Sequence, residues 1–276
     1  MKIYLESRYR KLVRGLPQTI FYCPECKGHR RRRRACERCE GYGKLTKDSV
    51  QELIARVLLP AYRARVGKFH GAGREDIDVR MLGRGRPFVF EVVAPRRLQV
   101  DLEELRQRLH QYEGERLEID PLVPVARERV ALWKESHFEK VYRAEVETGG
   151  PVPVDALGAL VGHEISILQR TPTRVAHRRA DLQRERCVSV LAAEPLGDRR
   201  LAVDVRCSHG TYVKEWISGD DGRTEPSLAS ALGVDCRCEA LDVLDILLDE
   251  SSSTSASWAD ASAPSRRPLS DVAGNG

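Results

Sequence analysis

Residues 71–90, GAGREDIDVRMLGRGRPFVF, carry the alternation from which the fold and the site are first predicted. In an extended chain successive side chains point to opposite faces, so Ile77, Val79 and Met81 would share one face. The other face carries two carboxylates between two guanidinium groups: Arg74, Asp76, Asp78 and Arg80. Such a face is typical of a solvated edge strand, with ion pairs worth about 0–1 kcal/mol each. It is equally typical of a site whose cations keep a carboxylate ionised without a metal.

Glycines 71, 73, 83 and 85 flank this charged stretch and permit tight turns and the close approach of another chain or a ligand. Downstream, PFVFEVV (87–93) is rich in β-branched and aromatic residues and is predicted as a strand. Upstream, Ser49-Val-Gln-Glu52 has the form of a capping box and starts an apolar pattern with helical spacing. We therefore expect a helix there that ends near Arg65.

The rest of the chain alternates between strand-like and helix-like segments. The predicted helices cover 101–111, capped by Asp101, and 155–162; the predicted strands cover 140–147, 163–169, a hairpin within 187–207, and 235–250. We expect a basic arm and a cysteine segment over 1–46, a main domain over 47–250, and a disordered Ser/Ala/Pro-rich tail over 251–276.

Composition bounds the class of protein. The chain has 276 residues, 41% of them hydrophobic, and a mean hydropathy of -0.43, which is enough for a large core. No apolar run approaches the roughly 20 residues of a membrane span, and the first residues lack the apolar region of a signal peptide. We therefore expect a cytoplasmic protein with no membrane partner.

The positive charge is concentrated at the N-terminal end. Residues 1–50 hold 14 Lys and Arg against 5 Asp and Glu, whereas the whole chain has a net charge of only +5. A basic end on a near-neutral body favours a polyanionic partner, RNA or DNA. Residues 7–19, SRYRKLVRGLPQT, are either a strand packed on the body or an RNA-contacting arm. Six arginines within 170–186 form either a solvated loop or a phosphate-binding one.

Four of the eight cysteines are paired as Cys23-Pro-Glu-Cys26 and Cys36-Glu-Arg-Cys39. In a cytosolic protein this spacing predicts a metal site rather than disulfides. Four thiolates close a tetrahedral shell around Zn²⁺ and leave no open position, so the site should be structural. Five consecutive arginines, Arg30–Arg34, lie between the pairs and are suited to phosphate contact.

Several separate motifs together resemble one family. HGAGREDIDVRMLGRGRPFVFEV (70–92), LQRTPTRVAHRR (168–179), HGTYVKEW (209–216) and GDDGRTEPSL (219–228) are similar to the archaeal and eukaryotic tRNA pseudouridine synthases that act on the TΨC arm. The N-terminal RYRKLVRGLPQT and the paired cysteines look like the same family. The resemblance covers about residues 7–250. It implies an α+β fold with a mixed, mostly antiparallel sheet, flanking helices and an active cleft across the sheet. Residues 47–250 would then be the catalytic domain.

The resemblance also implies site residues. Asp76 matches the catalytic aspartate, Tyr142 the tyrosine that stacks on the uracil, and Lys214 the basic residue paired with the aspartate. Asp78 is a rival nucleophile and Arg74 a second possible partner. The expected substrate contacts are Arg74, Arg30, Arg31, Arg32, Arg170, Arg178, Tyr212 and Arg223. The expected partner is the TΨC arm of tRNA, with uridine 54, uridine 55 or both as substrate.

The implied reaction breaks an N-glycosidic bond, rotates the base and forms a carbon–carbon bond. It needs a carboxylate, a cation beside it, an aromatic wall and a base for the proton on carbon 5, but no catalytic cofactor. The target base must first be flipped out of its stack, at a cost of a few kcal/mol.

Two other functions fit parts of the sequence. The acidic residues Glu75, Asp76 and Asp78 could hold Mg²⁺ in a nuclease or phosphotransferase, although Glu75 would point away from the other two in a strand. Alternatively, the chain could be a non-catalytic zinc-containing RNA-binding module.

Overall fold

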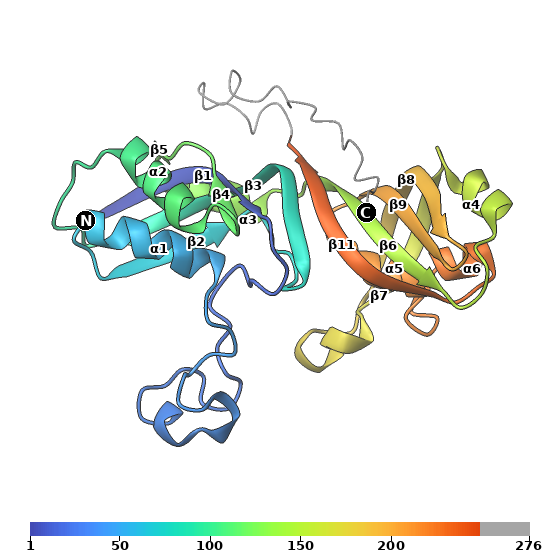
Figure 1. Cartoon of the computed structure of the whole chain (residues 1–276), viewed down its shortest axis with the longest axis horizontal. Coiled ribbons are helices and arrows are strands. Elements are labelled where there is room, and N and C mark those ends of the chain that lie inside the picture. The colour runs from blue at the N-terminus through green and yellow to red at the C-terminus, as the bar shows by residue number, and fades with distance from the viewer. Residues whose placement is uncertain (249–276) are drawn as a thin grey trace, which may run out of the picture.

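The computed structural model describes residues 1–248, and Figure 1 shows that they form an elongated molecule around one continuous sheet. The tail predicted over 251–276 and the side chain of Arg178 lie outside the described residues. The strands are β1 (Lys2–Lys11), β2 (Val66–Gly71), β3 (Val79–Val93), β4 (Leu117–Ile119), β5 (Val123–Pro124), β6 (Glu139–Thr148), β7 (Glu164–Arg170), β8 (Gln183–Gly197), β9 (Arg200–Cys207), β10 (Thr224–Glu225) and β11 (Cys236–Leu247). The α-helices are α1 (Val50–Ala61), α2 (Leu102–Glu113), α3 (Glu128–Glu135), α4 (Val154–Leu160), α5 (Val213–Ser218) and α6 (Leu228–Leu232).

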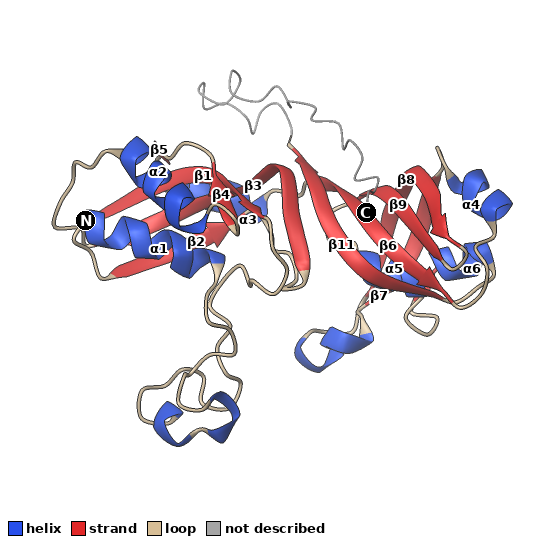
Figure 2. Ribbon diagram, in the orientation of Figure 1, coloured by secondary structure: helices blue, strands red, loops and turns tan. Residues whose placement is uncertain are grey.

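The sheet has the strand order β10-β7-β8-β9-β6-β11-β3-β1-β4, with β2 paired to β3 and β5 paired to β1. Its one parallel pair in the described chain joins Leu241–Val243 of β11 to Val79–Met81 of β3. Figure 2 shows helices packed around the strands in both halves. The predicted mixed, mostly antiparallel sheet with flanking helices is therefore confirmed.

The long strand β3 joins the two halves of the molecule. Its start pairs with β11, and its residues 86–93 pair with β1 and β2. Gly83 lies between these two regions with φ +56°, where an added Cβ would be 1.8 Å from the carbonyl oxygen of Leu244. The segment that approaches this glycine is β11 of the same chain, and any side chain at this position would collide with the β11 backbone.

The predicted helix caps are confirmed. The Ser49 side chain accepts a hydrogen bond from the backbone N–H of Glu52, and Asp101 accepts one from Glu104. Helix α1 ends at Ala61, before the predicted Arg65, because Arg63 takes a left-handed conformation with φ +47°.

The strand predicted through the charged stretch is wrong for its first part. Residues 72–78 form a loop between β2 and β3, and Ile77 is only half-buried. The buried side chains there are Ala72 and, unexpectedly for a charged residue, Glu75, which is 5% exposed. It turns inward because an ion pair and a hydrogen bond compensate its charge inside the protein, so strand alternation does not apply to this loop.

Residues 1–46 do not form one unit. β1 lies inside the sheet, whereas the cysteine segment projects from it on a stalk and has a small core of its own, made of cysteines (Figure 1). The arm is thus a strand, because its apolar residues Leu5 and Tyr9 are fully buried. None of the helices between residues 1 and 248 has the length and apolarity that crossing a membrane requires.

Candidate active site

The loop that carries Asp76 rests on a buried charged cluster. Both carboxylate oxygens of Glu75 accept a hydrogen bond from the Tyr9 hydroxyl, at 2.9 and 2.8 Å, and one accepts a bond from Arg86 Nε at 2.8 Å. Lys11 Nζ lies 3.7 Å from the same carboxylate. The side chains of Lys11, Glu75 and Arg86 are 0–1% exposed. Buried charges are tolerated only when they are paired and hydrogen-bonded in this way. These contacts therefore hold Glu75, and the loop that carries it, in one position.

Residues of β1 and the segment after it hold the loop backbone directly. Lys11 Nζ donates to the carbonyl oxygens of Asp76 and Ile77, at 3.1 and 3.3 Å. Gln18 Nε2 donates to the carbonyl of Gly73 at 2.9 Å, and Arg14 Nη1 donates to that of Asp78 at 2.8 Å.

These positioning residues were missed in the sequence. The sequence predicts a strand or an RNA-contacting arm here, and in the structure two cations of the segment, Lys11 and Arg14, bind backbone carbonyls inside the protein. The signal available in the sequence was the alternation of Leu5, Tyr9 and Lys11 with other side chains along β1, which marked a buried face but not its partner.

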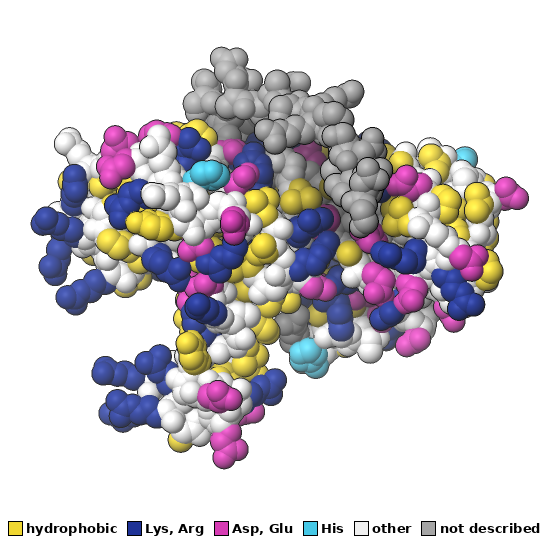
Figure 3. All heavy atoms as spheres, in the orientation of Figure 1, with side chains coloured by type: hydrophobic (Ala, Val, Ile, Leu, Met, Phe, Trp, Pro, Cys, Tyr) yellow, Lys and Arg dark blue, Asp and Glu magenta, His cyan; other side chains and the backbone are white. Residues whose placement is uncertain are grey.

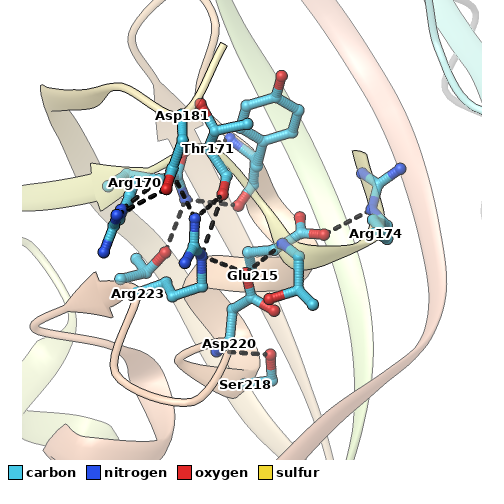
Figure 4. A network of polar contacts seen from close by, with 12 residues as sticks. Arg170, Thr171, Arg174, Asp181, Glu215, Ser218, Asp220 and Arg223 are labelled. Atoms are coloured by element: carbon cyan, nitrogen blue, oxygen red, sulfur yellow. Dashed lines mark hydrogen bonds and ion pairs between the residues drawn. The ribbon is translucent and has the colours of Figure 1, made fainter. Parts of the chain in front are cut away.

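The Asp76 side chain points away from this cluster and is 44% exposed. Its Oδ2 lies 3.1 Å from Nη2 of Arg174, which belongs to the short 3₁₀ helix 173–178 after β7. Arg174 Nε also donates to Glu215 Oε1 at 2.5 Å, as Figure 4 shows, and the guanidinium carbon lies 5.8 Å from the centroid of the Tyr212 ring. Asp76 thus lies beside a cation that two further groups hold in place.

The resemblance implied that Lys214 pairs with Asp76. In the structure, Lys214 contacts Asp78 instead. Its Nζ lies 2.6 Å from Asp78 Oδ2, so the two carboxylates of the loop have different cationic partners. Burial tends to raise the pKa of Asp78, but the hydrogen bond and charge of Lys214 outweigh it and hold that pKa below its usual value. The pairing was unpredictable from local sequence because the two residues are 136 positions apart.

Tyr142 lies in the middle of β6, between Val205 of β9 and Val243 of β11. Burial first, and then nearby negative charge that includes Glu75 and Asp76, raises the pKa of its hydroxyl above the usual range. The side chain therefore presents a neutral phenol at physiological pH, near enough to Asp76 to be affected by its charge.

Two of the residues predicted to contact the substrate also hold a loop together. Arg170 and Arg223 both bind Asp181, and Arg223 also donates to the carbonyl of Thr171 at 2.7 Å (Figure 4). Their charge is compensated within the protein, so the contacts give them a structural role at the base of loop 171–182. This loop carries Arg174.

The remaining predicted contacts differ in their surroundings. The Tyr212 hydroxyl accepts a hydrogen bond from Arg179 at 3.0 Å, and its backbone is held on both sides by Gln169, which is 3% exposed. Arg74 is exposed on the Asp76 loop and forms no ion pair within residues 1–248.

The four paired cysteines come together. Their sulfur atoms lie within 4.8 Å of one another, and the Cys23–Cys36 and Cys26–Cys39 distances are both 3.7 Å. Four thiolates about 2.3 Å from one ion would be separated by about 3.8 Å in a tetrahedron. The backbone N–H of Gly43 points at Cys39 Sγ, 3.1 Å away. The cluster is therefore able to hold a metal ion.

Exposed arginines cover this cysteine segment. Arg30, Arg31 and Arg32 are all exposed, as are Arg33 and Arg34, and Figure 3 shows Lys and Arg side chains gathered on it.

A magnesium site on the Asp76 loop is not supported, because Glu75 is buried and bound by Tyr9 and Arg86. Across residues 1–248, the four cysteines are the one group of ligand side chains close enough to share a metal.

Comparison with known proteins finds one family. Residues 4–247 match the family model described as "Pus10, C-terminal". The proteins named tRNA pseudouridine synthase Pus10 from Methanothrix thermoacetophila and Methanopyrus kandleri are 46% and 47% identical to this chain, over 245 and 250 residues. These matches cover 88% and 89% of this chain but 53% and 56% of the two relatives, so the chain spans little more than half their length.

Among solved structures, one similar chain is from a crystal structure of a Cbf5–Nop10–Gar1 complex. It has 19% sequence identity and a TM-score of 0.40, over 71% of this chain and 45% of the other.

Proposed function

Because the chain belongs to the Pus10 family, we propose that it isomerises uridine to pseudouridine in tRNA, with Asp76 as the catalytic residue. The relatives carry this activity in their names. The placement of Asp76 supports its assignment as the catalytic residue. Its half-exposed carboxylate lies 3.1 Å from Arg174 and within electrostatic range of Tyr142. The loop that carries it is held by the buried contacts of Glu75 and Lys11.

Each group has a task in this proposal. Asp76 acts on the extruded uridine, as a nucleophile or as a negative charge beside the developing cation on the sugar. Arg174 forms an ion pair with this carboxylate and holds it in position, and Tyr142 supplies the wall against which the freed uracil is held. Lys214 keeps Asp78 ionised and holds the C-terminal end of the same loop in place. The substrate is the TΨC arm, at uridine 54, uridine 55 or both.

We further propose that Cys23, Cys26, Cys36 and Cys39 hold Zn²⁺ as a structural ion with no part in the chemistry. The neighbouring arginines 30–34 would then contact phosphates of the tRNA. All cysteines are free, including those outside the cluster, which supports a cytoplasmic location. Metal analysis of freshly purified protein should find about one zinc per chain, and Cys26→Ser should lower that content.

The decisive experiment is incubation with an unmodified tRNA transcript, followed by mapping of pseudouridine at single-nucleotide resolution. Asp76→Asn should lower product formation by at least about a hundredfold while RNA affinity changes little. Asp155→Asn, an exposed carboxylate on α4, is the matched control and should keep full activity.

The competing assignments give different results in the same assay. Asp78→Asn abolishing product while Asp76→Asn retains it would transfer the catalytic role to Asp78. RNA binding by the unmodified protein without any product would support the non-catalytic RNA-binding module.

A further inference from the structure

A second cluster of basic side chains lies beside the Asp76 site. Its members come from β6, β8 and the loops next to them: His137, Lys140, Arg186 and His209. Among the side chains that the structure describes, none of the four forms an ion pair with an acidic group. The fully buried cations Lys11 and Arg86 both have a carboxylate partner. The side chains of Lys140 and Arg186 are half-buried and have none, so their charge is not compensated within the described chain.

Two nitrogen atoms of the cluster are buried without a hydrogen-bond partner in the described chain: Nε of Arg186 and Nδ1 of His209. The rings of His137 and His209 pack edge to face, with centroids 4.3 Å apart. Lys140 Nζ donates to the carbonyl oxygen of Phe138 at 2.7 Å and keeps further donor capacity. Buried polar atoms without partners are rare in folded proteins, and two of the seven such side-chain atoms within residues 1–248 lie in this one cluster. This makes the cluster a candidate ligand site.

Gly210 keeps this cluster accessible. It is exposed and has φ +80°, and an added Cβ would lie 3.3 Å from Arg186 Nη2. A side chain at this position would crowd the guanidinium group and strain the backbone. The glycine therefore leaves Arg186 open to an incoming group.

The electrostatics also favour an anion. Burial, followed by repulsion from Lys140, His137 and Arg186, lowers the pKa of His209 to about 4. Burial, followed by the charge of Arg86, lowers the pKa of Lys140 to about 8. A negative charge among these groups would offset both effects, because an opposite charge favours the protonated form of each.

The cluster borders the proposed uridine site on two sides. Lys140 and Tyr142 alternate onto the same face of β6, and the charge of Arg86 acts on both. On the other side, Arg186 lies within electrostatic range of Tyr212, which packs near Arg174. A nucleotide bound at Asp76 would therefore have its backbone close to these cations.

We propose that Lys140, Arg186 and His209 form a subsite for a phosphodiester group of the RNA backbone next to the extruded uridine. A phosphate oxygen supplies the acceptors that the two buried nitrogens lack, and its charge matches the ammonium and guanidinium groups. The contact positions the nucleotide without reading its base. This inference rests on the proposed function, since it takes tRNA as the ligand.

The test combines protein variants with RNA in which single phosphates are made neutral. Affinity for the tRNA arm is measured with one methylphosphonate linkage placed in turn at each position around the target uridine. The unmodified protein should lose about tenfold in affinity at one linkage, the worth of one charge-assisted contact. Arg186→Gln and His209→Gln should bind unmodified RNA more weakly and lose no further affinity at that linkage. Arg200→Gln, which removes an exposed arginine paired with Glu145, is the control and should behave like the unmodified protein.

Every outcome bears on the subsite. If Arg186→Gln and His209→Gln keep the full tenfold sensitivity at the same linkage, the assignment is wrong. If inorganic phosphate raises the melting temperature of the unmodified protein but not of Arg186→Gln, and no linkage shows coupling, the site binds a free anion and not RNA. Pseudouridine mapping with the same proteins separates the two proposals. Normal product formation, with no linkage at which the protein substitutions and the methylphosphonate show coupled effects on affinity, refutes the subsite alone. The absence of product from the unmodified protein refutes the proposed function and the subsite with it.

Discussion

Replacing Lys11 with methionine tests whether a buried ammonium group holds the Asp76 loop. Lys11→Met keeps a chain of similar length but removes the charge and its three hydrogen bonds, to the carbonyls of Leu16, Asp76 and Ile77. The side chain is 0% exposed, so water cannot replace these bonds without opening the loop.

The expected cost follows from these contacts. Removing one partner of a buried ion pair costs about 3–5 kcal/mol when the other charge is left uncompensated. Glu75 keeps Arg86 and Tyr9, so its charge remains paired, and the lower end of that range applies. We therefore expect Lys11→Met to lower the free energy of unfolding by about 3 kcal/mol. The rate of product formation should fall more than RNA affinity, because the loop positions Asp76 rather than the polynucleotide.

Urea denaturation followed by circular dichroism gives the stability, and single-turnover conversion of tRNA gives the rate. Lys68→Met is the matched control, because this lysine is 55% exposed and lies 3.8 Å from Glu91 on the same half of the molecule. The control should change stability by less than about 1 kcal/mol. A Lys11→Met protein as stable and as active as the control would refute the view that this ammonium group fixes the loop.

Three further predictions address the junction, the basic cluster and the cysteine segment. Gly83→Ala should destabilise the protein by about 2 kcal/mol or more in urea denaturation, because its Cβ would meet the Leu244 carbonyl. The control Gly158→Ala in α4, whose Cβ would meet no atom within 4 Å, should be neutral or slightly stabilising. Equal effects of the two substitutions would contradict the close approach at Gly83. The pKa of Lys140 is lowered from 10.5 to about 8, so between these pH values the unfolded chain binds more protons than the folded one, and the free energy of unfolding increases with pH. Lys140→Met should lack this increase when urea unfolding is compared at about pH 8 and about pH 10. A pH dependence left unchanged by the substitution would show that the ammonium group is solvated in the folded protein. Removing the proposed zinc ion with a chelator should weaken tRNA binding but leave the β-sheet signal, because the cysteine core is separate from the main core. Global unfolding on chelation would contradict that separation.

The local sequence predicted those features whose causes are local. The side chains of Ser49 and Asp101 cap the helices that follow them, and the two Cys-x-x-Cys turns converge on one point. Strand composition identified most of the sheet, because period-two burial acts over a few residues. The candidate residues Asp76 and Tyr142 were also identified from the sequence, through the resemblance of their motifs to a family.

The pairing of charges at the site depended on the assembled fold. Asp76 meets Arg174 and Asp78 meets Lys214, across about a hundred residues or more of chain, and local patterns carry no information on such contacts. Glu75, in turn, is buried only because β1 brings Tyr9 and Lys11 beneath the loop. A charged side chain leaves water only where partners from distant strands are already in place, so its role follows from how the strands pack and not from the order of its neighbours along the chain.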